Sequence, residues 1–229
     1  MPSPPPGRRP TRRTLLRVGV GGAGLAASAV LAGCTPARTP DPTAEATESP
    51  LDTTTHAGKT LLAYFSRAGE NWWNGGRRNL ETGNTEILAR MIAERTGCDL
   101  YRIEATDAYP AGYDETVARN VREQDTDARP DIAQPLPDFG AYDKLVLASP
   151  IWNVRPPMIM NTFLDGIDPA GKTILPAVTY AVSGLGDTLD VYTSAAPTAD
   201  IGAGLALRGE TVPDSTARIR DWLNDVGLD

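Results

Sequence analysis

Apolar and polar positions alternate with two different periods along the chain after residue 58. Short, almost wholly apolar runs at 60–65, 144–149 and 173–182 predict strands that are buried on both faces of a sheet. Two runs at 100–104 and 203–207 carry more polar residues, which is typical of strands at the edges of a sheet. The chain therefore predicts one sheet whose centre is formed by the three apolar runs.

Segments with helical periodicity separate these runs. The segment 85–95 places four apolar side chains on one face and stops at Gly97, a residue that commonly ends helices. Further helices are predicted at 113–122, 157–164, after Asp187 and at 214–226, with Ile219, Trp222 and Leu223 facing inward. Strands alternating with helices predict an α/β fold, an open, doubly wound sheet of five parallel strands with helices on both faces. In such sheets ligands bind beyond the carboxyl ends of the strands.

The N-terminal quarter of the chain carries export motifs. Arg12 and Arg13 precede an apolar run at 18–32 that is too short to span a bilayer as a stable anchor. The run ends in Leu-Ala-Gly followed by Cys34. In this order the motifs resemble a twin-arginine signal followed by the lipobox of lipoproteins. They predict a signal peptide at 1–33 and a lipid on Cys34, with an uncleaved leader that tethers the chain as the alternative.

A polar segment connects this cysteine to the folded part of the chain. Residues 34–57 are rich in Thr, Pro, Ala and acidic residues and have almost no large apolar side chains. Such a composition cannot offset the entropy of ordering, so we expect a disordered linker. The remaining residues, 58–229, predict a single domain. The expected location is the outer face of the cell membrane, reached by export and held through the lipid anchor.

The charge distribution argues against nucleic acid as a partner. The chain has 22 basic and 29 acidic residues, but five of the basic ones and none of the acidic ones precede Cys34. The part after the predicted cleavage site therefore carries 17 basic and 29 acidic residues. A domain this acidic should repel nucleic acid and anionic lipid headgroups.

Histidine and cysteine are too scarce for several kinds of site. The single histidine, His56, lies in the predicted linker, which excludes Ser-His or Cys-His catalysis and a histidine-ligated zinc site in the domain. Of the two cysteines, Cys34 belongs to the lipobox, so Cys98 is the domain's single thiol and no disulfide is expected within the domain. We therefore predict neither a metal site nor catalytic residues.

Small polar residues follow the first predicted strand and precede the first predicted helix. Ser66-Arg67 and Thr82-Gly83-Asn84-Thr85 are separated by fourteen residues, and together they resemble the phosphate loop of the flavodoxin family. Small residues and a glycine allow backbone N–H groups to converge on a phosphate at a helix N-terminus, where the helix dipole also favours an anion. The alternative is that the segment 82–85 merely caps the helix.

Two further loops carry the same resemblance. Pro150-Ile151-Trp152-Asn153 is similar to the family's loop after the third strand, in which an aromatic ring lies against the isoalloxazine of flavin mononucleotide (FMN). The alternative is a buried, structural tryptophan. The loop with Ser183, Gly184 and Gly186 resembles the family's Gly/Ser loop beside the flavin. The implied FMN-binding residues are Ser66, Arg67, Thr82, Gly83, Asn84, Thr85, Pro150, Ile151, Trp152, Asn153, Ser183, Gly184 and Gly186.

The resemblance implies electron transfer with an unidentified redox partner. It leaves open whether the protein is a carrier or an FMN-dependent oxidoreductase. One alternative is a reductase of flavins or quinones that uses NADH or NADPH. Another, of a different class, is a lipoprotein that has kept the flavodoxin fold as a binding module without flavin.

The fourteen residues that interrupt the phosphate loop, Ala68 to Glu81, form an insertion. Asn74-Gly75-Gly76 predicts a turn at its tip. Because both ends of the insertion lie beside the predicted phosphate loop, we expect it to cover one edge of the cofactor site. The alternative is a surface loop whose two tryptophans, Trp72 and Trp73, simply pack on the domain.

Overall fold

The computed structural model describes residues 59–229. The predicted signal peptide (1–33), the lipidated Cys34 and the linker (34–57) lie outside the described residues. Among the residues that are described, no helix has the length and apolar character needed to cross a membrane.

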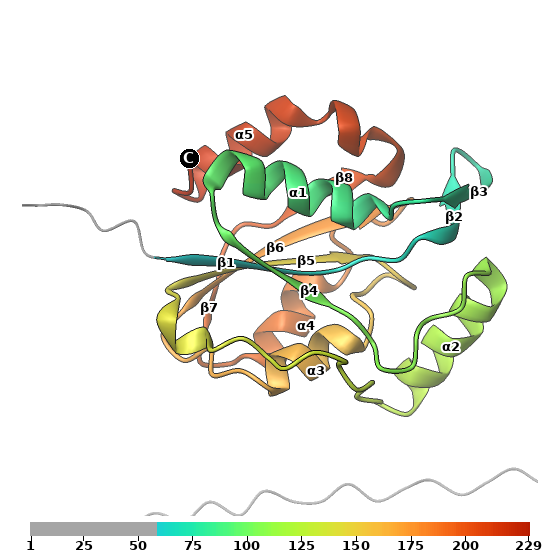
Figure 1. Cartoon of the computed structure of the whole chain (residues 1–229), viewed down its shortest axis with the longest axis horizontal. Helices are drawn as coiled ribbons and strands as arrows, with labels where there is room; N and C mark the ends of the chain where they lie inside the picture. Colours follow the sequence, from blue (N-terminus) through green and yellow to red (C-terminus); the bar gives the residue numbers. More distant parts are fainter. Residues whose placement is uncertain (1–58) are drawn as a thin grey trace, which may run out of the picture. The chain divides into compact units, whose positions relative to one another are not determined.

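A parallel sheet forms the centre of the domain (Figure 1). The strand order is β4-β1-β5-β6-β7, with β8 also paired to β6. The bounds are β1 Thr60–Phe65, β4 Asp99–Ile103, β5 Lys144–Pro150, β6 Thr173–Tyr180, β7 Asp200–Ile201 and β8 Leu205–Arg208. By position in the chain the order is 2-1-3-4-5, which is the order of doubly wound flavodoxin-like sheets. The predicted fold class is confirmed.

The last position of the sheet is shared by two short strands. β7 pairs with the start of β6 through Asp200 and Ile201, and β8 pairs with its end from Leu205 to Arg208. The sequence predicted one weak strand at 203–207. The central sheet therefore has five strand positions, as expected, but is built from six strands of the described residues, because the segment between β7 and β8 leaves the sheet.

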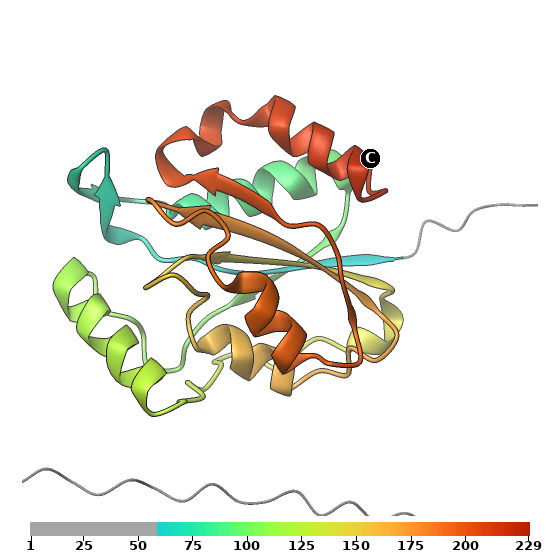
Figure 2. The ribbon, with the colours of Figure 1, turned by 180° about the vertical axis from the view of Figure 1, so that it is seen from behind.

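Helices cover both faces of the sheet (Figures 1 and 2). Helices α1 and α5 lie on one face and α3 and α4 on the other. The helix bounds are α1 Asn84–Thr96, α2 Tyr113–Asp125, α3 Ile159–Asp165, α4 Thr188–Ala195 and α5 Thr216–Asp225, with 3-10 turns η1 Phe139–Ala141 and η2 Gly209–Asp214. All five predicted helices are present, and α1 ends at Gly97 in the left-handed conformation (φ 67°), as expected.

The alternation of side chains along β1 explains why its sequence is apolar throughout. Leu62 packs in the core cluster under α1 and α5, whereas Leu61 and Phe65 pack in the cluster that contains α3 and α4. Successive side chains of a strand point to opposite faces, so a strand covered on both sides needs apolar residues at every position.

The insertion at 68–81 forms a β-hairpin. Strands β2 (Gly69–Trp73) and β3 (Gly76–Leu80) pair in antiparallel register, Trp73 opposite Gly76. The turn residues Asn74 (φ 46°) and Gly75 (φ 86°) are both left-handed, as a tight two-residue hairpin requires. The predicted turn at the tip is confirmed, while the two strands were not predicted. The hairpin follows β1 at the carboxyl end of the sheet (Figure 1).

Candidate functional site

The two halves of the predicted phosphate loop meet in space. The hydroxyl of Ser66, directly after β1, accepts a hydrogen bond from the backbone N–H of Glu86 in α1 (3.0 Å). A β-carbon on Gly83 would lie 2.5 Å from the carbonyl oxygen of Arg67 and closer still to Ser66 Oγ. Position 83 therefore has room for glycine alone, and the fourteen-residue insertion does not separate the two halves.

The N-terminus of α1 has unpartnered donors at this point. Gly83 is the N-cap residue in an extended conformation, and its carbonyl oxygen accepts hydrogen bonds from the N–H groups of Glu86 and Ile87. Within residues 59–229, the backbone N–H groups of Asn84 and Thr85 have no hydrogen-bond partner. These two donors, together with the positive end of the helix dipole, can hold an anion.

The side chain of Thr85 serves another purpose. Its hydroxyl is buried and shares a hydrogen bond of 2.7 Å with the hydroxyl of Thr179, near the end of β6. This contact fixes the start of α1 to the carboxyl end of the sheet. The side chain of Thr85 is therefore engaged, and its backbone N–H is the group that a phosphate could reach.

Arg67 lies at the predicted position but directs its guanidinium group away from the α1 N-terminus. Nη1 donates to the carbonyl oxygens of Pro110 (3.0 Å) and Ala111 (2.9 Å), and Nη2 donates to that of Glu70. Burial lowers the pKa of Arg67, against the opposing effect of the nearby Glu70 carboxylate, although an arginine stays charged. The residue therefore joins the hairpin to the loop before α2.

Trp152, in the loop after β5, is held in an aromatic cluster. Its ring centroid lies 5.5 Å from that of Phe65 and 5.2 Å from that of Tyr109, in edge-to-face contacts. Tyr109 in turn donates to the buried carboxylate of Glu123 (2.8 Å). The structural role that the sequence left as an alternative is thus present, and the same ring also lines the cavity described below.

The backbone after Trp152 is strained. Asn153 and Val154 have φ values of 50° and 62°, and the left-handed conformation is unusual for a β-branched residue such as valine. The turn is closed by hydrogen bonds between the backbones of Trp152 and Arg155. Strain of this kind commonly marks functional loops.

The third predicted loop packs against this turn. The carbonyl oxygen of Val154 accepts a hydrogen bond from the backbone N–H of Asp187 (2.7 Å). A β-carbon on Gly186 would overlap the carbonyl group of Val154, and Gly184 and Gly186 both have left-handed φ values of 60° and 50°. The glycines therefore allow the loops after β5 and β6 to approach each other closely.

The loop after β5, the end of β6, the start of α1 and the hairpin border a small cavity of about 90 Å³, which we call the carboxyl-end cavity; Ser183, Gly184 and Gly186 do not line it. Its lining residues are Asn71, Trp72, Asn84, Tyr113, Pro150, Ile151, Trp152, Thr179, Tyr180, Ala181 and Gly209. Four of the predicted residues, Asn84, Pro150, Ile151 and Trp152, lie in its wall. Ser66, Gly83 and Thr85 lie behind it as the supporting loop.

Several lining residues were not predicted. Thr179 and Tyr180 end β6, and the rule that sites follow the carboxyl ends of strands could have indicated them. Tyr113 starts α2, and Gly209 starts η2, where a side chain would overlap the amide of Asn84. No local pattern links these positions to the phosphate loop. Asn71 and Trp72 come from the hairpin, which therefore forms one wall of the cavity.

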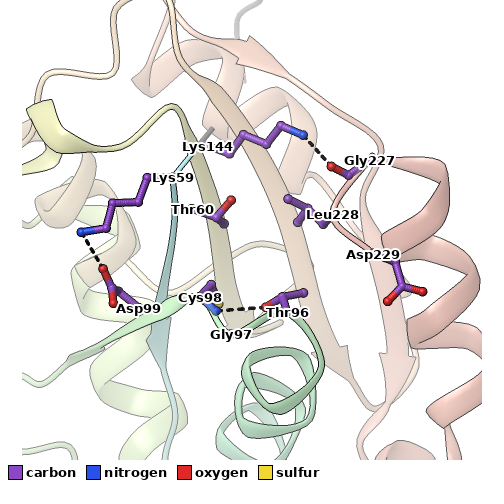
Figure 3. A pocket seen from close by; sticks show the side chains of 10 residues that line it. All are labelled: Lys59, Thr60, Thr96, Gly97, Cys98, Asp99, Lys144, Gly227, Leu228 and Asp229. Atoms are coloured by element: carbon purple, nitrogen blue, oxygen red, sulfur yellow. Dashed lines mark hydrogen bonds and ion pairs between the residues drawn. The ribbon is translucent and has the colours of Figure 1, made fainter. Parts of the chain in front are cut away.

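A larger cavity, of about 380 Å³, lies at the opposite end of the sheet, where the strands begin (Figure 3). It is lined by the first residues of β1, β4 and β5, together with the C-terminal residues of the chain. Lys144 donates there to the carbonyl oxygen of Gly227 (2.9 Å), and Lys59 pairs with Asp99 (2.9 Å). This cavity lies at the amino ends of the strands, whereas ligands of such sheets bind beyond the carboxyl ends, so we place the functional site at the carboxyl-end cavity.

No group of three potential metal-ligating side chains was found within the described residues. The carboxyl-end site can instead hold an anion at the α1 N-terminus and a flat, partly apolar group beside Trp152. The end of β6, with Thr179 and Tyr180, lines the cavity together with Asn84 and Trp152.

Comparisons with known proteins agree with this arrangement. The family model described as Flavodoxin matches residues 79–226, well over half of the chain. The match begins in β3, so β1 and most of the hairpin lie outside it. None of the curated proteins that were compared matches the chain.

Solved structures share the fold. A candidate flavoprotein from Bacteroides eggerthii is 28% identical, with a TM-score of 0.61 over 75% of this chain and 99% of that chain. Another from Bacteroides uniformis is 28% identical, with a TM-score of 0.60 over 73% and 98%. A flavoprotein from Lactobacillus acidophilus, in complex with FMN, is 20% identical, with a TM-score of 0.53 over 70% and 99%. At that identity the last likeness shows the fold alone.

Proposed function

The chain belongs to the flavodoxin family, and we propose that it binds FMN non-covalently at the carboxyl-end cavity and acts in electron transfer. One observation carries the proposal. Ser66 and Gly83, far apart in the loop, meet at the N-terminus of α1, where the N–H groups of Asn84 and Thr85 are unpartnered. The site thus combines an anion-binding helix end with an aromatic wall. The fold shared with the Lactobacillus acidophilus flavoprotein, which holds FMN, supports the same assignment.

The residues present fit a flavin mononucleotide. The phosphate would lie at the α1 N-terminus, where the small residues Ser66 and Gly83 let the backbone approach it. The ring would lie beside Trp152, between the loops after β5 and β6. Because the carboxyl-end cavity is much smaller than a flavin, we expect the ring to lie partly at the surface, along the loops that carry Asn153, Ser183 and Gly184.

Bound FMN supplies one-electron and two-electron transfer. The chain's own contribution is position and environment. Phe65 and Tyr109 hold the Trp152 ring in place, and the hairpin residues Asn71 and Trp72 limit the access of water from one side. The redox partner with which the protein would exchange electrons is not identified.

An absorbance spectrum of residues 58–229, purified with and without added FMN, tests the cofactor. We expect a yellow protein whose released flavin has the mass of FMN, because the site offers one phosphate position. Release of FAD, or a colourless protein after reconstitution, would overturn the proposal. Fast oxidation of NADH or NADPH by the same preparation would favour a reductase over a carrier.

We also propose that the protein is exported through the twin-arginine route and anchored at the outer face of the membrane by a lipid on Cys34. A route that carries folded proteins suits a cofactor bound before export. Arg12→Lys together with Arg13→Lys should retain the protein inside the cell, and Cys34→Ala should abolish labelling by a radioactive fatty acid. If the double lysine variant still reaches the outer surface with its flavin, the proposed route is wrong.

A further inference from the structure

Helix α2 lies at the periphery of the domain and stands away from the sheet (Figures 1 and 2). None of its residues belongs to either of the two core clusters of the described chain. Polar contacts hold it instead. The Thr116 hydroxyl donates to the carbonyl oxygens of Pro110 (2.9 Å) and Gly112 (2.8 Å), and Arg119 donates to the Glu123 carboxylate (2.6 Å). The side of the helix that faces the domain is therefore polar.

The burial pattern of α2 is the reverse of that of an ordinary surface helix. Its three buried residues, Thr116, Asn120 and Glu123, are all polar. Val117 and Val121, by contrast, are 44% and 40% exposed. A helix on the surface of a globular protein normally turns its apolar side towards the core. The core of this domain therefore gives no reason for the two valines, and contact with another molecule does.

The apolar side chains on the outer side form one stripe. Tyr113, Val117 and Val121 are spaced by four residues, which places them on the same face of the helix. Trp72 of the hairpin, 38% exposed, extends the stripe at its N-terminal end, since its ring centroid lies 6.3 Å from that of Tyr113. Ala118 is also exposed, and its small side chain allows a second helix to approach closely.

Two unpaired charges lie along one flank of this stripe. Glu115 and Arg122 are both exposed, and they lie on the same side of α2 because seven residues make almost two full turns. Within the described chain the ion pairs of α2 are those of Asp114 and of Arg119, so neither Glu115 nor Arg122 has one. The Glu115 carboxylate lies over Gly112, and no hydrogen bond between described residues holds it there.

Antiparallel pairing makes this surface complementary to itself. About a two-fold axis midway between Val117 and Val121, each of these valines lies opposite the other valine of the second copy. Arg122 of one copy then lies about 1.5 Å along the helix axis from Glu115 of the other, which is a displacement of one residue. Because the arrangement is symmetric, two such ion pairs form together. Parallel pairing would instead bring like charges together.

We propose that the domain forms a weak, symmetric dimer in which α2 packs antiparallel against α2 of a second copy. The charges favour a second copy over a different protein, because the two-fold arrangement gives both unpaired groups a partner. One pair of helices is a small interface, so we expect a dissociation constant of about 1–100 µM and a monomer at lower concentrations. Glu115, Val121 and Arg122 lie outside the carboxyl-end cavity, so the dimer does not depend on flavin binding.

Sedimentation velocity of the domain (58–229), which contains both core clusters, tests the dimer over a range of concentrations. We expect a reversible equilibrium between monomer and dimer. Val121→Asn should weaken dimerisation by about 10-fold or more, because each copy loses an apolar contact and places an amide in the interface. Val182→Asn makes the same change at an exposed valine in the loop after β6 and should leave the equilibrium unchanged.

Reversal of the flanking charges tests the antiparallel geometry. Glu115→Arg alone, or Arg122→Glu alone, places like charges together at both pairs and should weaken dimerisation by about 10-fold. An equimolar mixture of the two variants should form a heterodimer with nearly the native affinity, because each arginine then meets a glutamate. Glu94→Arg makes the same reversal at an exposed position of α1 and should leave dimerisation unchanged.

The mixture also separates association from folding. Each variant keeps its own effect on the stability of α2 when the two are mixed, so recovered association reports the charge pairs alone. A domain that stays monomeric well above the expected dissociation constant would overturn the proposal and leave the stripe to a different protein. A dimer that Val121→Asn does not weaken, or a mixture that associates no better than either variant alone, would also overturn it. The flavin content of each preparation is measured separately, so loss of the cofactor and loss of the dimer are distinguishable.

Discussion

Gly83 and Ser66 lie so close together that no side chain can be added at position 83. A β-carbon there would overlap Ser66 Oγ and approach the carbonyl oxygen of Arg67 to 2.5 Å. The Ser66 hydroxyl is fixed in turn by the backbone N–H of Glu86, which donates to it. This contact connects the end of β1 to the start of α1 across a fourteen-residue hairpin, and the proposed phosphate position depends on it.

Gly83→Ala should therefore weaken FMN binding by at least about 10-fold, equivalent to about 1.4 kcal/mol. The added methyl group must displace Ser66 or the backbone at Arg67, and such overpacking typically costs about 1–3 kcal/mol in stability as well. Fluorescence titration of the apoprotein with FMN measures the first effect, and urea unfolding measures the second.

Gly76→Ala is the matched control for that substitution. Gly76 lies in the hairpin, its φ is not left-handed, and the atom nearest to a β-carbon there would be the carbonyl oxygen of Trp73 at 3.9 Å. Alanine should be tolerated at this position with unchanged FMN affinity. Equal effects of the two substitutions would show that the contact between Ser66 and Gly83 has no special importance.

The hairpin is fixed to α2 by an ion pair. Arg77 makes two hydrogen bonds to the carboxylate of Asp114 (2.8 and 2.6 Å), and its guanidinium lies over the ring of Tyr113 at 4.7 Å. The hydrogen bond from Arg77 lowers the pKa of Asp114. The contact is therefore fully present above the ordinary pKa of an aspartate and is lost as the pH falls through the lowered value.

Asp114→Asn should accelerate hydrogen exchange of the hairpin amides at neutral pH, after correction for intrinsic rates. Asp221→Asn, at the exposed pair with Arg220, makes the same chemical change elsewhere and should leave the hairpin unaffected. Lowering the pH through the Asp114 pKa should accelerate hydrogen exchange of the hairpin amides in the native protein. In Asp114→Asn the same change of pH should have little further effect on that exchange. A hairpin whose exchange is insensitive to both changes would be held by its other contacts, such as the hydrogen bond from the Asn74 N–H to Glu210 (2.8 Å).

Val154 offers a test of backbone strain. It is a β-branched residue with φ 62° and is 49% exposed, so it gains little from burial at that position. Asparagine tolerates the left-handed region better. Val154→Asn should therefore raise the free energy of unfolding by about 1 kcal/mol.

Val121→Asn provides the comparison, because Val121 has a similar exposure (40%) but lies in the regular helix α2. That change should leave the free energy of unfolding unchanged or lower it slightly. If Val154→Asn lowers the melting temperature instead, packing of the Val154 side chain stabilises the fold by more than its left-handed backbone conformation destabilises it.

The sequence predicted the elements of the fold well because their signals are local. The apolar run of β1 and the glycine that ends α1 at Gly97 each depend on a few neighbouring residues. The division of the last strand position into β7 and β8 was not predicted, because it depends on where two short segments meet β6.

The candidate site was predicted only in part, for a related reason. Residues that follow strands, such as Trp152, could be found from the rule for parallel sheets. Tyr113 and Gly209 could not, because they approach the site from elements whose placement is a tertiary property. The direction of the Arg67 guanidinium likewise depends on the loop at Pro110 and Ala111, forty residues and more along the chain.

The last prediction concerns the hydrogen bond between Thr85 and Thr179, which is buried and 2.7 Å long. Thr85→Val or Thr179→Val alone leaves one hydroxyl buried without a partner, which should cost about 1–3 kcal/mol. The double variant removes both hydroxyls at nearly constant shape and should cost much less than the sum of the two, since unpartnered groups no longer remain. Urea unfolding of the four proteins gives the coupling free energy, and additive costs would contradict the hydrogen bond.

The variant Thr85→Val also distinguishes the contribution of the Thr85 side chain to FMN binding from that of its backbone N–H. Thr85→Val keeps the N–H group that we assign to the phosphate, so FMN affinity should change far less than in Gly83→Ala. A loss of FMN affinity as large as that of Gly83→Ala, in a variant that still unfolds cooperatively, would show that the hydroxyl itself contributes to cofactor binding. The contact with Thr179 would then have to open when the cofactor binds, and the role of Thr85 would move from its backbone to its side chain.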